Sequence, residues 1–250
     1  MYILEDRVCA SRTDLNGIMK LAGAIDVIQD CSLLWIESEP SFRDFLAANN
    51  LGMFVVSRQA DIIRLPAYGE RITVRTSIFD VKGYLGYRNT AMYGEDGLPC
   101  VLTWSVGAFV NRDTGKMARL PQGVIDRIAI DDKIDMEYLD KKILLPDSPG
   151  RRLNAAMVRR SDIDFNRHMN NAKYIEAALE FLPEDFAVGR LRIEYKAPAK
   201  LGDLLYPKRM EDPSGKIYIL LLNAQDQPFA VAEFSRREAE HERIKAVGKA

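Results

Sequence analysis

The chain has 250 residues, of which 47% are hydrophobic, and its formal net charge at pH 7 is −1. A chain of this length and composition can bury the core of one large domain or of two small ones. The near-zero net charge argues against a nucleic-acid binder that works by neutralising many phosphates. A chain with this net charge can still carry local basic clusters.

The three cysteines, Cys9, Cys31 and Cys100, are far apart and show no CxxC spacing. Neither a disulfide framework nor a zinc site is therefore indicated, and a reducing compartment fits best. The N-terminus carries acidic residues at once, and no apolar run has the length of a signal peptide or a membrane span. We expect a soluble cytoplasmic protein without cofactor or metal.

A helix is predicted early in the chain, because apolar residues recur at helical spacing from Ile18 to Leu33 after the turn sequence Asp14-Leu15-Asn16-Gly17. Glu39-Pro40 ends this helix, and a second short helix is expected at about 42–48. From Met53 onward the spacing becomes that of strands, with β-branched and aromatic residues at 72–78, 84–93 and 101–110. The first half therefore predicts a long helix followed by an antiparallel sheet.

Residues 124–152 are rich in charge and interrupted by Pro146 and Pro149, which is typical of a connector between two halves. The second half then repeats the order of the first. It has a lead-in strand at 153–158, a polar loop, a helix to about Leu182, and strands at about 189–196, 203–211, 216–223 and 229–236. The charged tail after Arg237 is expected to fray.

The repeat is visible in single residues as well. Asp14 and Asn16 stand 150 positions before Asp164 and Asn166, and at the same offset an isoleucine stands where the second copy has His168. A helix followed by a sheet, twice over, predicts an α+β fold in which each half wraps a long antiparallel sheet around a central helix. We place the first copy at 1–130, a linker at 131–152 and the second copy at 153–250, with a natural cleft between the copies.

The polar loop before the second helix concentrates the groups that attack on a carbonyl requires. Asp164, Asn166, His168 and Asn170 lie within seven residues, beside the free amides of a helix N-terminus. The alternative is a helix cap rich in aspartate and asparagine, in which the histidine only makes hydrogen bonds that stabilise the fold. The only other histidine is His241 in the charged tail, and the first copy lacks the loop histidine, so we expect one active site per chain.

The segment Asp164-Phe165-Asn166-Arg167-His168-Met169-Asn170-Asn171-Ala172-Lys173-Tyr174 resembles the Asp-x-Asn-x-His-x-Asn-Asn-x-Lys-Tyr signature of the acyl-acyl-carrier-protein thioesterases, the plant enzymes and their bacterial relatives. It also contains the looser Asp-x-x-x-His-x-Asn pattern of many hotdog-fold thioesterases. The resemblance implies a tandem hotdog fold and hydrolysis of the thioester between a fatty acyl chain and its carrier protein. The expected partner is then acyl carrier protein with a phosphopantetheine-linked acyl chain.

Several alternatives stay open beside this hypothesis. An acyl-CoA thioesterase belongs to the same reaction class, and a non-catalytic hotdog protein that binds acyl thioesters belongs to another. A plastid enzyme would need a transit peptide, which the sequence does not show, so a bacterial type is favoured. The oligomeric state is open and includes a homodimer.

Carried over residue by residue, the family's catalytic aspartate, asparagine and histidine fall on Asp164, Asn166 and His168. Plant members also carry Tyr-Arg-Arg-Glu-Cys in a following strand, where this sequence reads Tyr195-Lys196-Ala197-Pro198-Ala199. Without that glutamate and cysteine, the water-activating group is open between His168, Asp164 and the helix carboxylate Glu176, with Asn170 as a further site candidate. Glu194 precedes the plant glutamate by four strand positions, roughly 13 Å, which is too far for a direct substitute.

Two further groups of residues have a functional and a plain structural interpretation. Apolar residues of the first copy are either acyl-tunnel lining, which the resemblance links to chain-length preference, or simple core; they are Ile18, Met19, Leu21, Ile25, Ile28, Trp35, Phe54 and Trp104. Basic residues flanking the loop meet either an acidic carrier protein and its phosphate or only solvent; they are Arg159, Arg160, Arg167 and Lys173.

Overall fold

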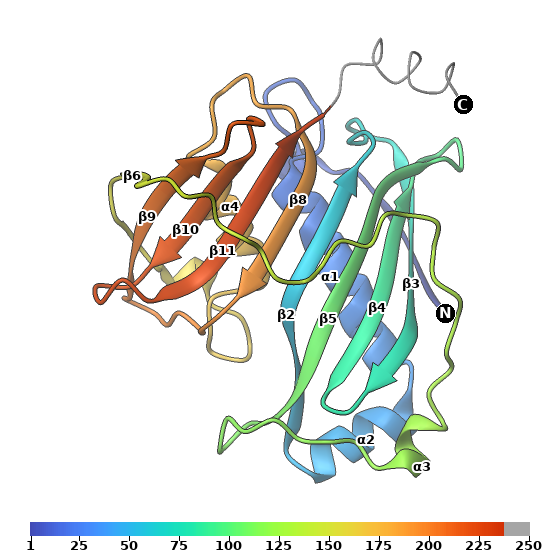
Figure 1. Ribbon diagram of the computed structural model, residues 1–250. Coiled ribbons are helices and arrows are strands. Elements are labelled where there is room, and N and C mark those ends of the chain that lie inside the picture. Colours follow the sequence, from blue (N-terminus) through green and yellow to red (C-terminus); the bar gives the residue numbers. More distant parts are fainter. Residues whose placement is uncertain (238–250) are drawn as a thin grey trace.

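The computed structural model describes residues 1–237 and contains one continuous antiparallel sheet with two helices, α1 and α4, on the same face (Figure 1). The predicted fraying tail and His241 lie outside the described residues. The sheet order is β1-β3-β4-β5-β2-β8-β11-β10-β9-β6, with β7 paired to β9. The first five strands belong to the first half of the chain and the others to the second, as the repeat predicts.

The first half contains the following elements: β1 (Tyr2–Arg7), a 3-10 turn (Ala10–Arg12), α1 (Leu21–Glu37), α2 (Pro40–Ala48), β2 (Leu51–Ile62), β3 (Arg71–Lys82), β4 (Leu85–Tyr93), β5 (Pro99–Asn111) and α3 (Gln122–Ile125). The second half contains β6 (Arg151–Arg152), β7 (Ala156–Met157), a 3-10 turn (Arg160–Asp162), α4 (Asn171–Leu179), β8 (Val188–Tyr195), β9 (Leu204–Glu211), β10 (Ile217–Leu222) and β11 (Pro228–Arg236).

Three sequence predictions need correction. The long helix begins at Leu21 rather than Ile18, because residues 14–18 form a tight turn closed by hydrogen bonds to the Asp14 side chain. The lead-in strand of the second half shrinks to the two residues of β7, whereas the corresponding strand β1 of the first half was not predicted at all. The helix of the second half, α4, ends at Leu179, three residues before the predicted end at Leu182.

The repeat extends to individual hydrogen bonds. In the first copy the amide of Asp14 donates to the carbonyl of Ile18 at 2.8 Å, and in the second copy the amide of Asp164 donates to the carbonyl of His168 at 2.9 Å. The isolated bridges Thr13↔Met19 and Ile163↔Met169 also correspond at the offset of 150 residues. The loop that carries His168 is therefore a structural element that both copies possess.

The two halves join where β2 and β8 pair, from Ser57↔Glu194 to Asp61↔Arg190. The last pair is a bidentate ion pair in which Nε and Nη2 of Arg190 donate to the two carboxylate oxygens of Asp61 at 2.6 and 2.9 Å. The main hydrophobic core spans this junction. It includes Ile25 and Ile28 of α1 and Ile175 of α4, each with zero exposed fraction.

The connector between α3 and β6 crosses the face of the sheet opposite α1 (Figure 1). Its Ile143 is buried against Tyr218 and Leu220 of β10, whereas Leu144 and Leu145 are exposed. The connector is held by the buried carboxamide of Gln59, which donates to the carbonyl of Glu137 at 2.7 Å. No helix within residues 1–237 is long and apolar enough to span a membrane.

Candidate active site

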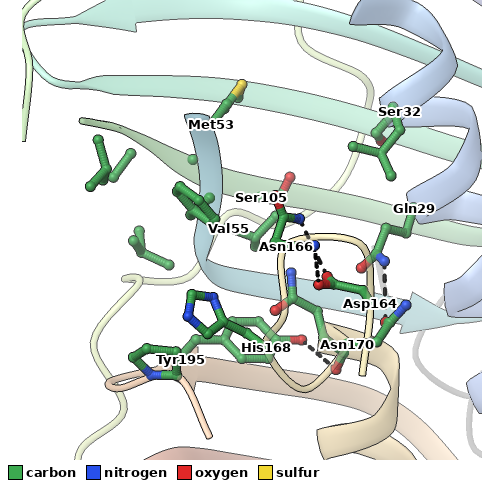
Figure 2. Close-up of a pocket in the computed structure, with 18 of the residues that line it drawn as sticks. Gln29, Ser32, Met53, Val55, Ser105, Asp164, Asn166, His168, Asn170 and Tyr195 are labelled. Carbon is green, nitrogen blue, oxygen red and sulfur yellow. Dashed lines mark hydrogen bonds between the residues drawn. The ribbon is translucent and has the colours of Figure 1, made fainter. Parts of the chain in front are cut away.

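A cavity of about 740 Å³ lies where the two halves meet, between α1 and the sheet of the first half and the loop before α4. Figure 2 shows Gln29, Ser32, Met53 and Ser105 of the first half around this cavity, together with His168 and its neighbours from the second half. Most of the lining comes from the first half. The polar groups of the His168 loop close one end, so the site needs both copies.

The ring of His168 lines the cavity, is partly exposed, and makes no hydrogen bond with any residue among 1–237. The loop is held by main-chain bonds instead, including the bond from the Asp164 amide to the His168 carbonyl. An imidazole with both ring nitrogens unengaged by the protein can accept a proton from a bound water. A histidine with a purely structural role would hydrogen-bond the protein through its ring. The placement of His168 does not fit that alternative.

Asp164 and Asn166 form an Asx turn rather than the cap of the helix. Oδ1 of Asp164 accepts from the amide of Asn166 at 2.8 Å, as Oδ1 of Asp14 does from the amide of Asn16 at 2.9 Å. Oδ2 of Asp164 accepts a longer bond of 3.4 Å from Nδ2 of Asn166. The carboxylate is therefore occupied by its own loop.

One difference between the two turns concerns a backbone amide. In the first copy Oδ1 of Asp14 also accepts from the amide of Ile18 at 2.9 Å. The equivalent amide, that of His168, has no acceptor among the described residues. The second copy thus keeps the turn and leaves an additional N–H free near its histidine.

The N-terminus of α4 is capped by Asn170, whose Oδ1 accepts from the amide of Ala172 at 2.9 Å. Nε2 of Gln29, on α1 of the first half, donates to the same oxygen at 3.2 Å. The amide of Asn171 has no acceptor among the described residues, and Asn171 lines the cavity. This amide, at the positive end of the helix dipole, is available to an anionic oxygen.

Arg112 is a site residue that the sequence did not reveal. It follows β5 in the first half, and its Nη1 donates to Oδ1 of Asn166 at 2.8 Å. Because a guanidinium has only donors, this bond orients the carboxamide with its oxygen toward Arg112 and its NH2 toward Asp164. In the sequence Arg112 is only part of a turn, and no periodicity connects it with a loop in the other copy.

The carboxylates that line the cavity are Asp30 and Asp164. Glu176 is not among the lining residues; its carboxylate is half exposed and pairs with Lys173 at 2.5 Å. Glu194 faces the connector, where its Oε1 accepts from the amide of Ile143 at 2.7 Å. Of the positions that hold the plant glutamate and cysteine, Pro198 lines the cavity but offers no carboxylate, and Ala199 is buried in the main core.

Two tyrosines stand behind the loop, and burial keeps both phenols protonated. Burial raises the pKa of Tyr174 to about 12, and its hydroxyl oxygen accepts from the amide of Ala199 at 2.7 Å. Burial also raises the pKa of Tyr195, whose hydroxyl donates to the carbonyl of Asn171 at 3.1 Å. These groups brace the start of α4 and are poor candidates for a base.

Of the apolar residues considered for an acyl tunnel, Phe54 lines the cavity. Met19, Leu21, Ile25 and Ile28 belong to the main core, which favours the plain structural interpretation for them. Trp104 lies on the other face of the sheet, where its Nε1 donates to Gln59 at 3.0 Å and its ring packs on Tyr138. The remaining two do not line the cavity; they are Ile18 and Trp35.

Comparison with models of known protein families shows which family this chain belongs to. Residues 5–128 match the model of the acyl-ACP thioesterase N-terminal domain, and residues 150–227 match that of the acyl-ACP thioesterase C-terminal domain. The chain belongs to the acyl-ACP thioesterase family. The sequence signature around His168 therefore identified the family correctly; the His168 loop lies in the part that matches the C-terminal model, and most of the cavity lining lies in the part that matches the N-terminal model.

A curated relative of this chain is a chloroplastic acyl-[acyl-carrier-protein] hydrolase of Cuphea viscosissima. It is 24% identical over 221 residues, which cover 84% of this chain and 51% of the relative. The chain thus spans about half the length of the curated relatives it matches, with corresponding shares of 42% and 43% for the next two.

Two solved structures share the fold of this thioesterase family member. An acyl-ACP thioesterase from Bacteroides thetaiotaomicron has a TM-score of 0.83 at 20% identity, covering 94% of this chain and 97% of that one. A 12:0-ACP thioesterase from Umbellularia californica has a TM-score of 0.83 at 17% identity, with coverages of 94% and 96%. The predicted α+β tandem hotdog fold is confirmed.

Proposed function

We propose that this chain hydrolyses the thioester of a fatty acyl chain on acyl carrier protein, releasing the free fatty acid and the carrier thiol. The observation that carries the proposal is the unengaged imidazole of His168 at one end of a cavity of about 740 Å³, beside the uncapped amide of Asn171. We further propose that residues 1–130 supply most of the acyl cavity and that residues 153–250 supply the reacting groups.

In the proposed mechanism a water between His168 and Asn166 attacks the thioester carbonyl carbon while the imidazole takes its proton. The amide of Asn171 donates to the oxyanion, helped by the positive end of the helix. The tetrahedral intermediate then collapses, the C–S bond breaks, and the imidazolium returns its proton to the leaving thiolate. Asp164 holds the loop, since both of its oxygens already accept from Asn166.

A carrier protein rather than a free coenzyme is favoured by the exposed basic residues around the loop. Arg159, Arg160 and Arg167 are exposed, whereas the ammonium of Lys173 is paired with Glu176. Exposed cations of this kind suit a transient contact with the acidic surface of a carrier protein; the phosphate of the pantetheine arm is common to both thioesters and does not distinguish them. The oligomeric state stays open and includes a homodimer, and the cytoplasmic location stays a proposal, supported by three unpaired cysteines.

The test is release of free thiol from acyl carrier protein and from acyl-CoA by the unmodified chain and by His168→Ala and Asn166→Ala. We expect His168→Ala to lower kcat by about two to four orders of magnitude, the range for loss of a general base. Asn166→Ala should lower it by about ten- to a hundred-fold, since one hydrogen-bonding group that positions the water is lost. Full turnover by both variants would show that the site lies elsewhere.

The matched control is Asn16→Ala, because Asn16 occupies the same turn in the first copy. This variant should retain full turnover. Faster turnover of acyl-CoA than of acyl carrier protein would support the coenzyme A alternative. Absence of turnover together with saturable binding of both thioesters would support the non-catalytic acyl-binding alternative.

A further inference from the structure

Met53 of β2 lies between the cavity and a second hydrophobic core in the first half. Met53 and Ile36 of α1 both line the cavity, and both pack against this core, which includes Phe109 of β5. Figure 2 shows Met53 away from His168, with Val55 between them. An acyl chain that starts at His168 and runs between α1 and the sheet therefore points its end toward Met53.

Two glycines form the surface on which the side chain of Met53 lies. Gly86 of β4 and Gly107 of β5 stand directly opposite each other in the sheet register. A Cβ atom on Gly107 would lie 2.5 Å from Cε and 3.0 Å from Cγ of Met53. A Cβ atom on Gly86 would lie 3.3 Å from the same Cε. The methionine side chain therefore fills the space that two missing side chains leave.

The backbone itself requires neither glycine. Gly86 and Gly107 have no positive φ, and each lies inside a strand, where glycine is destabilising relative to alanine. Glycine inside a strand marks a bulge or a close approach of another group to the backbone. The pairing of β4 with β5 is regular at both positions, so the close approach of Met53 accounts for the two glycines.

The position of the Met53 thioether decides how far the cavity extends. Methionine is unbranched and has three rotatable bonds, so its side chain adapts to the space that its neighbours leave. Behind it stands the ring of Phe109, whose Cζ lies 3.4 Å from the Cβ position of Gly86. A methyl group added at Gly107 would therefore push the thioether toward the cavity, whereas truncation of Met53 would lengthen the cavity.

We propose that Met53, seated on Gly86 and Gly107, sets the longest acyl chain that the cavity accepts. The terminal methyl group of the chain meets the thioether, and a longer chain has to displace the thioether against Phe109. The inference rests on the proposed thioester hydrolysis for the reaction at His168. The length limit is a property of binding, and it can be measured without turnover.

The first experiment measures kcat/KM for carrier-protein thioesters of saturated acyl chains of increasing length. Met53→Ala removes Cγ, Sδ and Cε, so the best chain should become longer by about two carbons. For a chain that newly fits, kcat/KM should rise about four-fold per buried methylene. Gly107→Ala should shift the best length in the opposite direction. The double variant should return toward the unmodified profile, because the added methyl group no longer meets a thioether.

The control variant is Met210→Ala. Met210 of β9 is buried in a different cluster, together with Ile143 of the connector, and does not line the cavity. This substitution should lower stability, as loss of a buried methionine does, and leave the best chain length unchanged. An unchanged profile in both Met53→Ala and Gly107→Ala, or a shift of both in the same direction, would overturn the proposal.

The second experiment measures binding of free saturated fatty acids of graded length by calorimetry, with His168→Ala as the background for the same substitutions. A length limit that moves up in Met53→Ala and down in Gly107→Ala supports the inference even if no thioester is hydrolysed. A limit that stays in place overturns it even if the chain is an active thioesterase. Circular dichroism spectra check that each variant is folded, and Met53→Ala alone tests the proposal if Gly107→Ala is not.

Discussion

Nη1 of Arg112 and Oδ1 of Asn166 form a hydrogen bond of 2.8 Å that links the two copies across 54 residues of chain. Nε of Arg112 also donates to the carbonyl of Leu51 at 3.3 Å, which ties the same guanidinium to the start of β2. The first copy thereby holds a side chain of the reacting loop in the second. Arg112 is a positioning residue, since it acts on Asn166 and does not reach the reacting atoms itself.

Arg112→Ala should lower kcat about ten-fold with little change in KM, because the carboxamide of Asn166 loses its fixed orientation and substrate contacts are unaffected. Arg112→Lys, which retains one donor, should recover part of the loss. Steady-state kinetics of thiol release measure both. A matched control is Arg152→Ala, which breaks an exposed ion pair with Asp226 away from the cavity. Equal losses in the Arg112→Ala and Arg152→Ala variants would contradict the positioning role.

The turn that carries the site requires a left-handed residue in both copies. Gly17 has φ +73° and its counterpart Arg167 has φ +62°. Gly17→Ala should lower the free energy of unfolding by about 1–2 kcal/mol, because a Cβ is strained in this region. The melting temperature should fall by about 2–4 °C per kcal/mol for a chain of this size. Gly123→Ala, on α3 with open space around it, should be neutral or stabilising.

Arg167→Gly is the reciprocal change. Relief of the left-handed strain outweighs or balances the backbone entropy that a glycine loses on folding, so stability should stay equal or rise by up to about 1 kcal/mol. Differential scanning calorimetry measures both variants. A clear loss of stability in Arg167→Gly would mean that the arginine side chain contributes contacts that offset its backbone strain.

The fold was predictable because its signals are local and occur twice. Alternation at 72–78 and helical spacing at 18–33 each fix the type of an element, and the Asp-x-Asn turn repeats at an offset of 150 residues. The predictions of secondary structure that were missing or wrong also have physical causes. Strand β1 lies at the sheet edge with one face exposed and charged residues along it, so its alternation is weak. Residues 14–18 form a turn because Asp14 bonds backbone amides there.

The candidate site likewise has one part that the sequence predicts and another that only the structure reveals. The loop from Asp164 to Asn170 is contiguous, and its motif could be read directly. Arg112 and Gln29 reach that loop from the other copy, and only the packing of α1 and β5 against it reveals the contacts. Arg58 and Arg88 line the cavity as well, and only the register that sets both opposite Ser105 shows that they share one face of the sheet.

The three thiols should differ in reactivity. Cys9 is exposed, whereas Cys31 and Cys100 are buried and burial raises the pKa of each to about 11. At pH 8 the thiolate fraction of a group with this pKa is about one in a thousand, and the thiolate is the reactive form. Titration with a thiol reagent should show one fast-reacting thiol in the folded chain and three after denaturation. Cys9→Ser should abolish the fast phase, and the slow rate should rise with pH toward about 11.

The connector should depend on the carboxamide of Gln59, which is 2% exposed. Its Nε2 donates to the carbonyl of Glu137 at 2.7 Å, and its Oε1 accepts from Nε1 of Trp104 at 3.0 Å and from the amide of Leu139 at 3.2 Å. Gln59→Leu leaves the buried indole N–H of Trp104 unpaired and removes two part-buried bonds to the connector, so the free energy of unfolding should fall by about 1–3 kcal/mol.

Limited proteolysis of the same variant checks the location of the effect, because loss of these bonds should release residues 131–150 and make cleavage there faster than elsewhere. The matched control is Gln122→Leu on α3. Its Nε2 donates to Oδ1 of Asp126 at 2.8 Å in an exposed position, and its loss should change stability by no more than about 0.5 kcal/mol. Cleavage that is unchanged in Gln59→Leu would show that Ile143 and its apolar contacts hold the connector without the carboxamide.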